Sequence, residues 1–207
     1  MKHSDFLTAI RKNRLYIFTV NDVARYFPET ARKTIQNQVQ IWTEKGRLER
    51  LRRGVYLVRF PEGGPVVPDF FIANKLYETS YVSMETALSF YSIIPEVAAA
   101  VTSVTARQTK LFKNKFGIFR YNSCKNEAFC GYKIMVYDGF KIYIAEKEKA
   151  LADFVYFKKR SGEEIDLASE RFDEVGLKKL SWKKIFYYAK FFGKKTRADL
   201  RKIRSRL

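Results

Sequence analysis

The stretch 31–58 constrains the fold more than any other part of the chain, because the spacing of its apolar residues changes part-way along. Its first half repeats apolar residues at every third or fourth position: Ala31, Ile35, Val39 and Trp42. From Leu48 onward, apolar and charged residues alternate, and Arg52–Gly54 separates two such runs. The sequence therefore predicts a helix followed at once by a short β-hairpin.

The residues before and around this helix carry further boundary signals. Pro28 keeps the preceding helix from continuing, Thr30 is the expected N-cap, and Gly46 is the expected C-terminal glycine. Two more amphipathic helices precede it, one after Ser4 and one after Thr19 or Asn21. Their apolar faces comprise Phe6, Leu7 and Ile10 in the first, and Val23, Ala24 and Phe27 in the second. Asp22 follows Thr19 by three residues, as in a capping box. Three helices and a hairpin within residues 1–60 are typical of a winged helix-turn-helix.

The face of the third helix opposite its apolar stripe is basic and rich in amides: Arg32, Lys33, Gln36, Asn37 and Gln40. Asn and Gln can pair with adenine edges, and Arg and Lys with guanine edges. Arg50, Arg52 and Arg53 are expected near the tip of the hairpin, the wing, where they would meet phosphates or a minor groove. A solvated helix in a protein-docking module is the alternative. Such a face usually mixes Glu with Lys, so this composition favours duplex DNA.

The charge of the chain is concentrated at its two ends. The chain has 40 Lys and Arg against 22 Asp and Glu, a net charge of +18. Residues 1–62 hold 13 basic and six acidic residues, and residues 177–207 hold 12 basic residues and one acidic residue. Residues 63–176 hold 15 of each kind. This distribution predicts two electropositive surfaces beside a neutral body.

Composition limits the class of protein and its compartment. The hydrophobic fraction of 46% is enough for a core. No apolar run approaches the roughly 20 residues of a membrane span, and the N-terminus lacks a signal-peptide core. Two cysteines, Cys124 and Cys130, are too few for a disulfide framework, and we expect both to be buried thiols. A cytoplasmic protein without a membrane partner is the expectation.

Residues 61–69 contain three of the five prolines and two adjacent glycines, so we expect a linker there. The following region, 70–207, has helix starts at Asp69 and Ser83. Its strand-like runs and a later helix cover the ranges 101–105, 116–121, 132–137, 140–145 and 147–156. Asp138-Gly139 joins two of these runs as a hairpin turn. The prediction is an α+β fold whose second domain has a small, mainly antiparallel sheet.

From about residue 177 the chain is basic and helical. One helix has an apolar face of Trp182, Ile185, Phe186, Ala189 and Phe192 and ends at Gly193. The last helix has a thin apolar stripe of Leu200, Ile203 and Leu207. Basic residues surround that stripe: Lys194, Lys195, Arg197, Arg201, Lys202, Arg204 and Arg206. This helix is either a second phosphate-binding surface or a solvated terminal helix. A membrane-surface helix fits less well, because the apolar stripe is thin.

Few residues of this chain are suited to catalysis. The single histidine, His3, lies at a terminus that we expect to be mobile, which excludes Ser-His, Cys-His and most zinc sites. Phosphate-binding and dinucleotide-binding glycine motifs are missing. Glu146, Glu148 and Asp153 are expected on one capped amphipathic helix. Asp138 and Glu146 could serve a metal-dependent nuclease, but no Glu-x-Lys triplet accompanies them. We expect no enzymatic activity, cofactor or metal.

With these residues in view, the chain resembles the AbiEi family, the antitoxins of type IV toxin–antitoxin systems in abortive infection. The matching stretches are FTVNDVARYF with TARKTIQNQVQIWTEKGRLERLRRGVYLV, then YVSMETALSFYSIIPE, then IAEKEKALADFVYF. Within the first, the family's strand and wing pattern matches Gly46, Leu48, Glu49, Arg50, Arg53, Gly54, Val55 and Tyr56. Arg47 departs from the pattern, since family members more often carry a small or apolar residue there.

The resemblance implies an N-terminal domain that binds operator DNA, with inverted repeats, and represses its own operon. It also implies that the C-terminal domain antagonises a nucleotidyltransferase-like toxin, either directly or functionally. A stand-alone regulator whose second domain senses a ligand or partner is the alternative. A nuclease is a less favoured third reading, and the oligomeric state is left open.

Overall fold

The computed structural model describes residues 1–95, 99–165 and 170–207. The chain divides into two compact units, Met1–Pro68 (unit 1) and Asp69–Leu207 (unit 2), which are described separately. Both units combine helices with a β-sheet, so the α+β class is confirmed.

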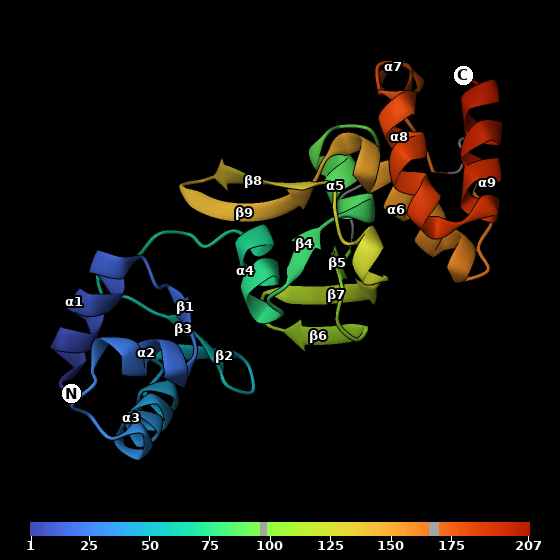
Figure 1. The fold of residues 1–207 in the computed structure, drawn as a ribbon. Coiled ribbons are helices and arrows are strands. Elements are labelled where there is room, and N and C mark those ends of the chain that lie inside the picture. The colour runs from blue at the N-terminus through green and yellow to red at the C-terminus, as the bar shows by residue number, and fades with distance from the viewer. Residues whose placement is uncertain (96–98, 166–169) are drawn as a thin grey trace. The chain divides into compact units, whose positions relative to one another are not determined.

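Unit 1 contains three helices and a three-stranded antiparallel sheet (Figure 1). The helices are α1 (His3–Asn13), α2 (Val20–Tyr26) and α3 (Arg32–Glu44). The strands are β1 (Ile17–Phe18), β2 (Leu48–Arg52) and β3 (Val55–Val58), in the order β1-β3-β2. The two-residue β1 was not expected from the sequence, because two apolar residues are too few to show strand alternation.

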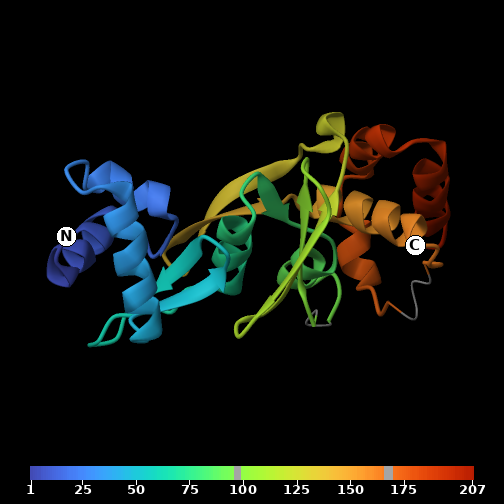
Figure 2. The ribbon, with the colours of Figure 1, turned by 90° about the horizontal axis from the view of Figure 1, so that it is seen from below.

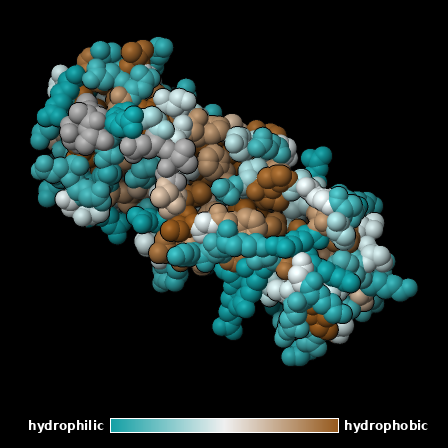
Figure 3. All heavy atoms as spheres, turned by 180° about the vertical axis from the view of Figure 1, so that it is seen from behind, coloured by the Kyte–Doolittle hydropathy of each residue, from teal (hydrophilic) through white to brown (hydrophobic). Residues whose placement is uncertain are grey.

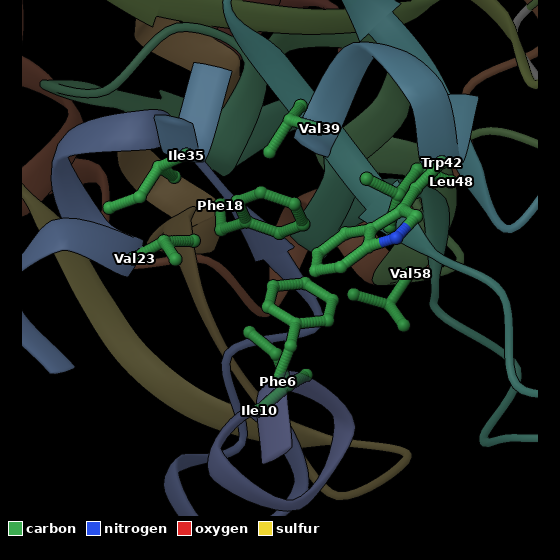
Figure 4. Packing of buried hydrophobic residues seen from close by; sticks show 9 residues of the cluster. All are labelled: Phe6, Ile10, Phe18, Val23, Ile35, Val39, Trp42, Leu48 and Val58. Atoms are coloured by element: carbon green, nitrogen blue, oxygen red, sulfur yellow. The ribbon is translucent and has the colours of Figure 1, made fainter. Parts of the chain in front are cut away.

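One hydrophobic core joins every helix and strand of unit 1 (Figure 4). Its buried residues are Phe6, Ile10, Phe18, Val23, Ile35, Val39, Trp42, Leu48 and Val58. The Trp42 ring lies 4.8 Å from the Phe6 ring and 4.9 Å from the His3 ring, measured between centroids. The expectation of a mobile terminus at His3 was therefore wrong, since this side chain is held in α1 against Trp42. Burial of the imidazole, with Arg47 nearby, lowers the pKa of His3.

Local signals at the helix ends of unit 1 are mostly as predicted. Thr19 and Asp22 form the capping box, with the Thr19 backbone N–H donating to Oδ2 of Asp22 at 2.8 Å. Gly46 has a φ of +68°, and the next backbone N–H donates to the Trp42 carbonyl, which ends α3. Thr30 was the wrong N-cap. Its backbone N–H closes a turn onto Phe27, and α3 begins one residue later with Ala31 as its exposed N-cap.

Unit 2 combines the strands of a single sheet with helices, and every element described after β9 is helical. Its first half contains α4 (Asp69–Leu76), β4 (Ser80–Val82), α5 (Met84–Phe90), β5 (Val101–Thr105), β6 (Lys110–Asn114), β7 (Gly117–Ser123) and the 3-10 helix η1 (Asn126–Ala128). Its second half contains β8 (Tyr132–Tyr137), β9 (Phe140–Ala145), α6 (Lys147–Arg160), α7 (Glu174–Lys178), α8 (Trp182–Ala189), the 3-10 helix η2 (Lys190–Phe192) and α9 (Lys194–Ser205).

The sheet of unit 2 is mainly antiparallel, as the sequence predicted, but it is larger than expected and contains two parallel pairs. In the described residues it has six strands in the order β6-β7-β5-β4-β9-β8. The pairs β4–β9 and β5–β7 are parallel, and the other three neighbouring pairs are antiparallel. Each parallel pair joins strands that are not consecutive in the chain, which local patterns do not reveal. The Asp138-Gly139 hairpin is confirmed, with both residues at positive φ.

Helix α6 is the central helix of unit 2. It packs against α5, α8 and α9, and Figures 1 and 2 both show it between the sheet and the C-terminal helices. Seven of the nine residues from Lys149 to Phe157 are apolar, and all but Tyr156 are buried. The capped amphipathic helix expected here was wrong at Asp153, because that side chain is fully buried rather than solvated.

Asp153 is buried together with its hydrogen-bond donors. Its Oδ2 accepts from the Ser83 hydroxyl at 2.8 Å and from the Tyr81 hydroxyl at 3.1 Å. Its Oδ1 pairs with the ammonium group of Lys149, which is also fully buried. Burial raises the pKa of Asp153, and Lys149 and the two hydroxyls partly offset that effect. Ser83 precedes α5 as predicted, but its hydroxyl serves Asp153 rather than the helix end.

The basic C-terminus is part of this unit. Leu200 and Ile203 of α9 are buried, as are Ile185 and Ala189 of α8, so both helices contribute apolar surface to the core. Gly193, at φ +94°, separates the two helices as predicted. In the part of the chain that the structure describes, we find no helix long and apolar enough to cross a membrane.

We predict that removing either member of the buried Lys149–Asp153 pair greatly lowers the free energy of unfolding. Lys149→Met leaves the Asp153 carboxylate without its cation, and we expect unfolding free energy to fall by about 3–5 kcal/mol in urea denaturation. Asp153→Asn is expected to cost a similar amount. The double variant contains no unpaired charge, so its loss should be smaller than the sum of the two.

The exposed pair Lys75–Glu78 provides the control for this cycle. Lys75→Ala should cost less than about 1 kcal/mol, because a solvated pair adds little. If Lys149→Met and Lys75→Ala lowered the free energy of unfolding equally, the buried pair would contribute no more to stability than an exposed pair, contrary to the prediction.

Candidate nucleic-acid interface

Helix α3 turns a polar face to solvent. Its apolar residues Ile35, Val39 and Trp42 are buried in the unit 1 core. The five residues predicted to read bases are all exposed: Arg32, Lys33, Gln36, Asn37 and Gln40. The helical period therefore places these polar side chains away from the core, where a ligand can reach them.

The β2–β3 hairpin follows α3 directly. Arg53 and Gly54 form its turn, and Gly54 has a φ of +79°, a conformation that favours glycine. The register shifts between Arg50, which pairs with Tyr56, and Arg52, which pairs with Val55. This bulge lets Leu51 point into the core while Arg50 is exposed.

The three hairpin arginines differ in their surroundings. The Arg52 side chain is half-buried, and its guanidinium donates to the Arg53 carbonyl at 3.1 Å. Arg50 and Arg53 are exposed. Within the described residues, no carboxylate lies in ion-pair contact with either of them, whereas Arg59 binds Glu49 and Arg25 binds Asp22. Arg50 and Arg53 therefore keep their charges available to an incoming anion.

A hollow of about 600 Å³ lies between α3 and the hairpin. Its lining residues are Val20, Gln36, Gln40, Thr43, Glu44, Arg50, Arg53, Gly54 and Tyr56. Four of the predicted site residues meet here, namely Gln36, Gln40, Arg50 and Arg53. The other four predicted residues of unit 1 lie outside this lining: Arg32, Lys33, Asn37 and Arg52. The hollow thus places amide groups opposite two unpaired guanidinium groups.

Glu44 is a lining residue that the sequence analysis did not single out. The Gln40 amide donates to its carboxylate at 3.0 Å. This contact orients Gln40 and leaves one negative charge in the same lining as Arg50 and Arg53. The spacing of four residues between Gln40 and Glu44 on a helix was the available signal.

The second predicted surface lies on α9 of unit 2. Its exposed basic residues are Lys194, Lys195, Arg201, Lys202, Arg204 and Arg206. Arg197 differs, because its side chain is half-buried. The buried residues Thr196, Leu200 and Ile203 share the opposite side of the helix. In the space-filling view, hydrophilic residues cover most of the face drawn (Figure 3), as expected for a chain with a net charge of +18.

The acidic residues considered for metal-dependent chemistry do not converge. Asp138 and Glu146 flank opposite ends of β9. The Glu146 carboxylate accepts from the Tyr188 hydroxyl at 3.0 Å and from Lys184 at 3.1 Å. Across residues 1–95, 99–165 and 170–207, no group of three His, Cys, Asp or Glu residues could hold a metal ion. Asp138, Glu146 and Asp153 thus occupy separate positions.

The two cysteines lie near the buried pair of α6. Cys124 is buried, and this burial raises the pKa of its thiol to about 12. Cys130 is only partly buried, which corrects the expectation of two core thiols, and burial also raises the pKa of its thiol. Both groups therefore stay protonated near neutral pH and are poor nucleophiles and metal ligands.

A hollow of about 570 Å³ in unit 2 has a mixed lining. Ile94 and Phe157 supply apolar walls, and Glu85, Arg120 and Lys158 supply charges. Burial raises the pKa of Glu85. Its volume would suit a small molecule, which is the feature that a ligand-sensing second domain would need.

Neither the models of known protein families nor the curated protein sequences contain a match to this chain.

Proposed function

We propose that unit 1 is a winged helix-turn-helix domain that binds duplex DNA and that the protein represses its own operon. The observation that carries this proposal is the hollow that places the amide-rich face of α3 beside Arg50 and Arg53. The order of helices and strands in unit 1, with α3 followed by an antiparallel hairpin, also supports it.

In this proposal α3 enters the major groove and the hairpin lies along the adjacent backbone. A major groove is wide enough for one helix, and amide side chains distinguish adenine from the other bases there. The guanidinium groups of Arg50 and Arg53 bind phosphates, which contributes affinity without sequence preference. Gln36 and Gln40 then read bases between these anchors.

The proposed role as an antitoxin depends on the resemblance to the AbiEi family. In that role unit 2 antagonises a nucleotidyltransferase-like toxin, directly or functionally. A downstream nucleotidyltransferase gene would favour the antitoxin, and its absence would favour a stand-alone regulator. Both versions share the same DNA-binding unit, so the experiments on unit 1 apply to either.

We predict that the exposed amides of α3 determine sequence preference. Gln36→Ala and Asn37→Ala should each weaken binding to the protein's own promoter by about 1–3 kcal/mol if a bidentate base contact is lost. Binding to unrelated DNA should change little. Gel-shift titrations on promoter and scrambled duplexes measure both quantities. Equal losses on the two duplexes would contradict base reading by α3.

The charges in the hollow should act on all duplexes alike. We expect Arg50→Ala and Arg53→Ala to weaken promoter and scrambled DNA equally and to lower the salt slope by about one unit for each lost phosphate contact. Glu44→Gln should strengthen binding by about three-fold, the effect of removing one unit of like charge several ångströms away in water.

Lys12→Ala and Glu29→Gln are the matched controls, since both residues are exposed and lie outside the hollow lining. Each removes the same charge as its counterpart. The hairpin would have no role in DNA binding if the Arg50/Arg53 double variant kept the affinity and salt slope of Lys12→Ala.

We further propose that the exposed face of α9 binds phosphates. Removal of the tail cannot test this, because α8 and α9 contribute to the unit 2 core. Replacing Lys195, Arg201, Lys202 and Arg204 by glutamine keeps that core and removes four charges. Affinity for every duplex and the salt slope should both fall, by up to about four units of slope.

The control for this variant neutralises four exposed lysines elsewhere in unit 2: Lys115, Lys125, Lys147 and Lys179. Both variants have the same net charge. Identical salt slopes would show that α9 is an ordinary solvated helix.

A further inference from the structure

Strand β8 forms one edge of the unit 2 sheet and exposes apolar side chains. Tyr132, Ile134 and Val136 alternate along it and are 38%, 59% and 66% exposed. Their side chains share one face with Tyr143 of β9, which is 40% exposed. Figure 1 shows β8 and β9 extending as a two-stranded ribbon beyond the rest of the sheet.

The backbone groups of the same three residues point to the open edge. In β9, the Tyr143 N–H and carbonyl bind the Asn74 side chain of α4, at 2.8 and 3.2 Å, and so face away from β8. Ile134 is opposite Tyr143 in the antiparallel register. Ile134 is therefore in a non-hydrogen-bonded pair, and its own N–H and carbonyl face outward. The backbone N–H and carbonyl groups of Tyr132 and Val136 also face outward, because backbone direction in a strand repeats every two residues.

The opposite edge strand of the sheet, β6, carries charged residues that oppose pairing with a further strand. Strand β6 has the sequence KLFKN, with exposed lysines at positions 110 and 113. Charged residues on an edge strand oppose pairing with another strand. In β8 the single charged side chain is Lys133, which lies on the other face from the apolar row and stands over the Tyr91 ring.

We propose that β8 pairs with β8 of a second copy of this chain, antiparallel and two-fold symmetric about Ile134. In this register Ile134 faces Ile134 of the second copy, and Tyr132 faces Val136 of the second copy. Each of these positions directs both backbone groups outward, so all three cross-pairs are of the hydrogen-bonded kind. Aromatic and β-branched residues are also favourable partners across strands.

The charges of the strand fit a second copy. Lys133 faces Met135 of the second copy, so no lysine opposes a lysine. Residues 63–176, which include the whole sheet, hold equal numbers of basic and acidic residues, and the approach of two sheets is therefore not opposed by net charge. The remaining positive charge of the chain lies outside this range.

The size of the patch determines how strong the pairing is. One aromatic side chain buries about 150–250 Å² when it is fully covered. The partly exposed side chains of Tyr132, Ile134, Val136 and Tyr143 together therefore offer an area on the order of 300 Å² per copy. A stable interface needs roughly 800 Å² per partner. We therefore expect a weak dimer that forms with rising concentration. This inference goes beyond DNA binding and does not depend on it.

Charge substitution at the symmetry axis tests the proposal. Sedimentation velocity of the full chain over a concentration series should show dimers for the natural sequence. Ile134→Lys alone and Ile134→Glu alone should both remain monomeric, because each places like charges opposite each other. A mixture of the two variants should form dimers again, since the opposite charges attract. Only self-pairing about Ile134 gives this pattern.

Leu111→Lys is the matched control, because it adds the same charge to a residue of β6 that is 61% exposed. It should dimerise like the natural sequence. Three results would overturn the proposal: a natural chain that stays monomeric throughout, an Ile134→Lys variant that dimerises normally, or a mixture that stays monomeric. Binding of β8 to a different protein would appear as the first of these.

Amide hydrogen exchange on the natural chain provides a test that needs no variant. The N–H groups of Tyr132, Ile134 and Val136 should exchange more slowly at high protein concentration. Those of Lys133 and Met135 already face β9 and should not change. Concentration-independent exchange at all five amides would overturn the pairing.

Discussion

Lys149 and Asp153 lie one turn apart on α6, and both are removed from solvent. A carboxylate in such a place is stable only when its lone pairs are satisfied and its charge is compensated. Three donors meet this requirement, namely Lys149, Ser83 and Tyr81. Because Tyr81 belongs to β4 and Ser83 precedes α5, the position of α6 determines where both of those elements lie.

The same pair connects the sheet to the C-terminal helices. The Lys149 ammonium lies 4.8 Å from the centre of the Phe192 ring, in the turn between α8 and α9. At Gly131, just before β8, a Cβ atom would come within 2.6 Å of the Tyr188 ring and 3.1 Å of the Lys149 side chain. Only glycine fits there, and its φ of +72° also favours glycine. These contacts hold the turn before α9 against the rest of unit 2. The position of α9 is therefore fixed, although most of its charged side chains are in solvent.

The parts of the fold that the sequence could predict are those determined by neighbours along the chain. The capping box at Thr19, the glycine at the end of α3 and the Asp138-Gly139 turn depend on residues within one turn of each other. The same holds for the exposure of Gln36, Asn37 and Arg53, since one helical period and one hairpin place them. Thr30 was misassigned because threonine is a common N-cap and Ala31 matched the spacing of the apolar stripe. Only the backbone shows that Thr30 closes a turn and that Ala31 is the exposed N-cap.

What the sequence could not show depends on partners distant in the chain. Asp153 has the same local pattern as a solvated helix acid, and only the approach of β4 and α5 buries it. Strand β4 has three residues, and its parallel pairing with β9 joins Val82 to Ile144. Glu44 belongs to the candidate site because the hairpin folds back beside α3. The burial of Asp153 and the pairing of β4 with β9 depend on contacts between residues far apart in the sequence, which local spacing does not reveal. For Glu44, the spacing predicts the contact with Gln40 but not the approach of the hairpin.

The distribution of charge along the chain separates surfaces that can associate with each other from surfaces that cannot. Lysines keep β6 from pairing further, and the equal numbers of acids and bases in residues 63–176 make the sheet region neutral overall. The excess charge lies before and after that region, in residues 1–62 and 177–207. An edge with a single charge, such as β8, offers little repulsion to another copy of itself, whereas surfaces with excess positive charge repel one another and attract polyanions. In our proposals, self-association and anion binding therefore belong to different parts of the same chain, and neither has to be weakened for the other.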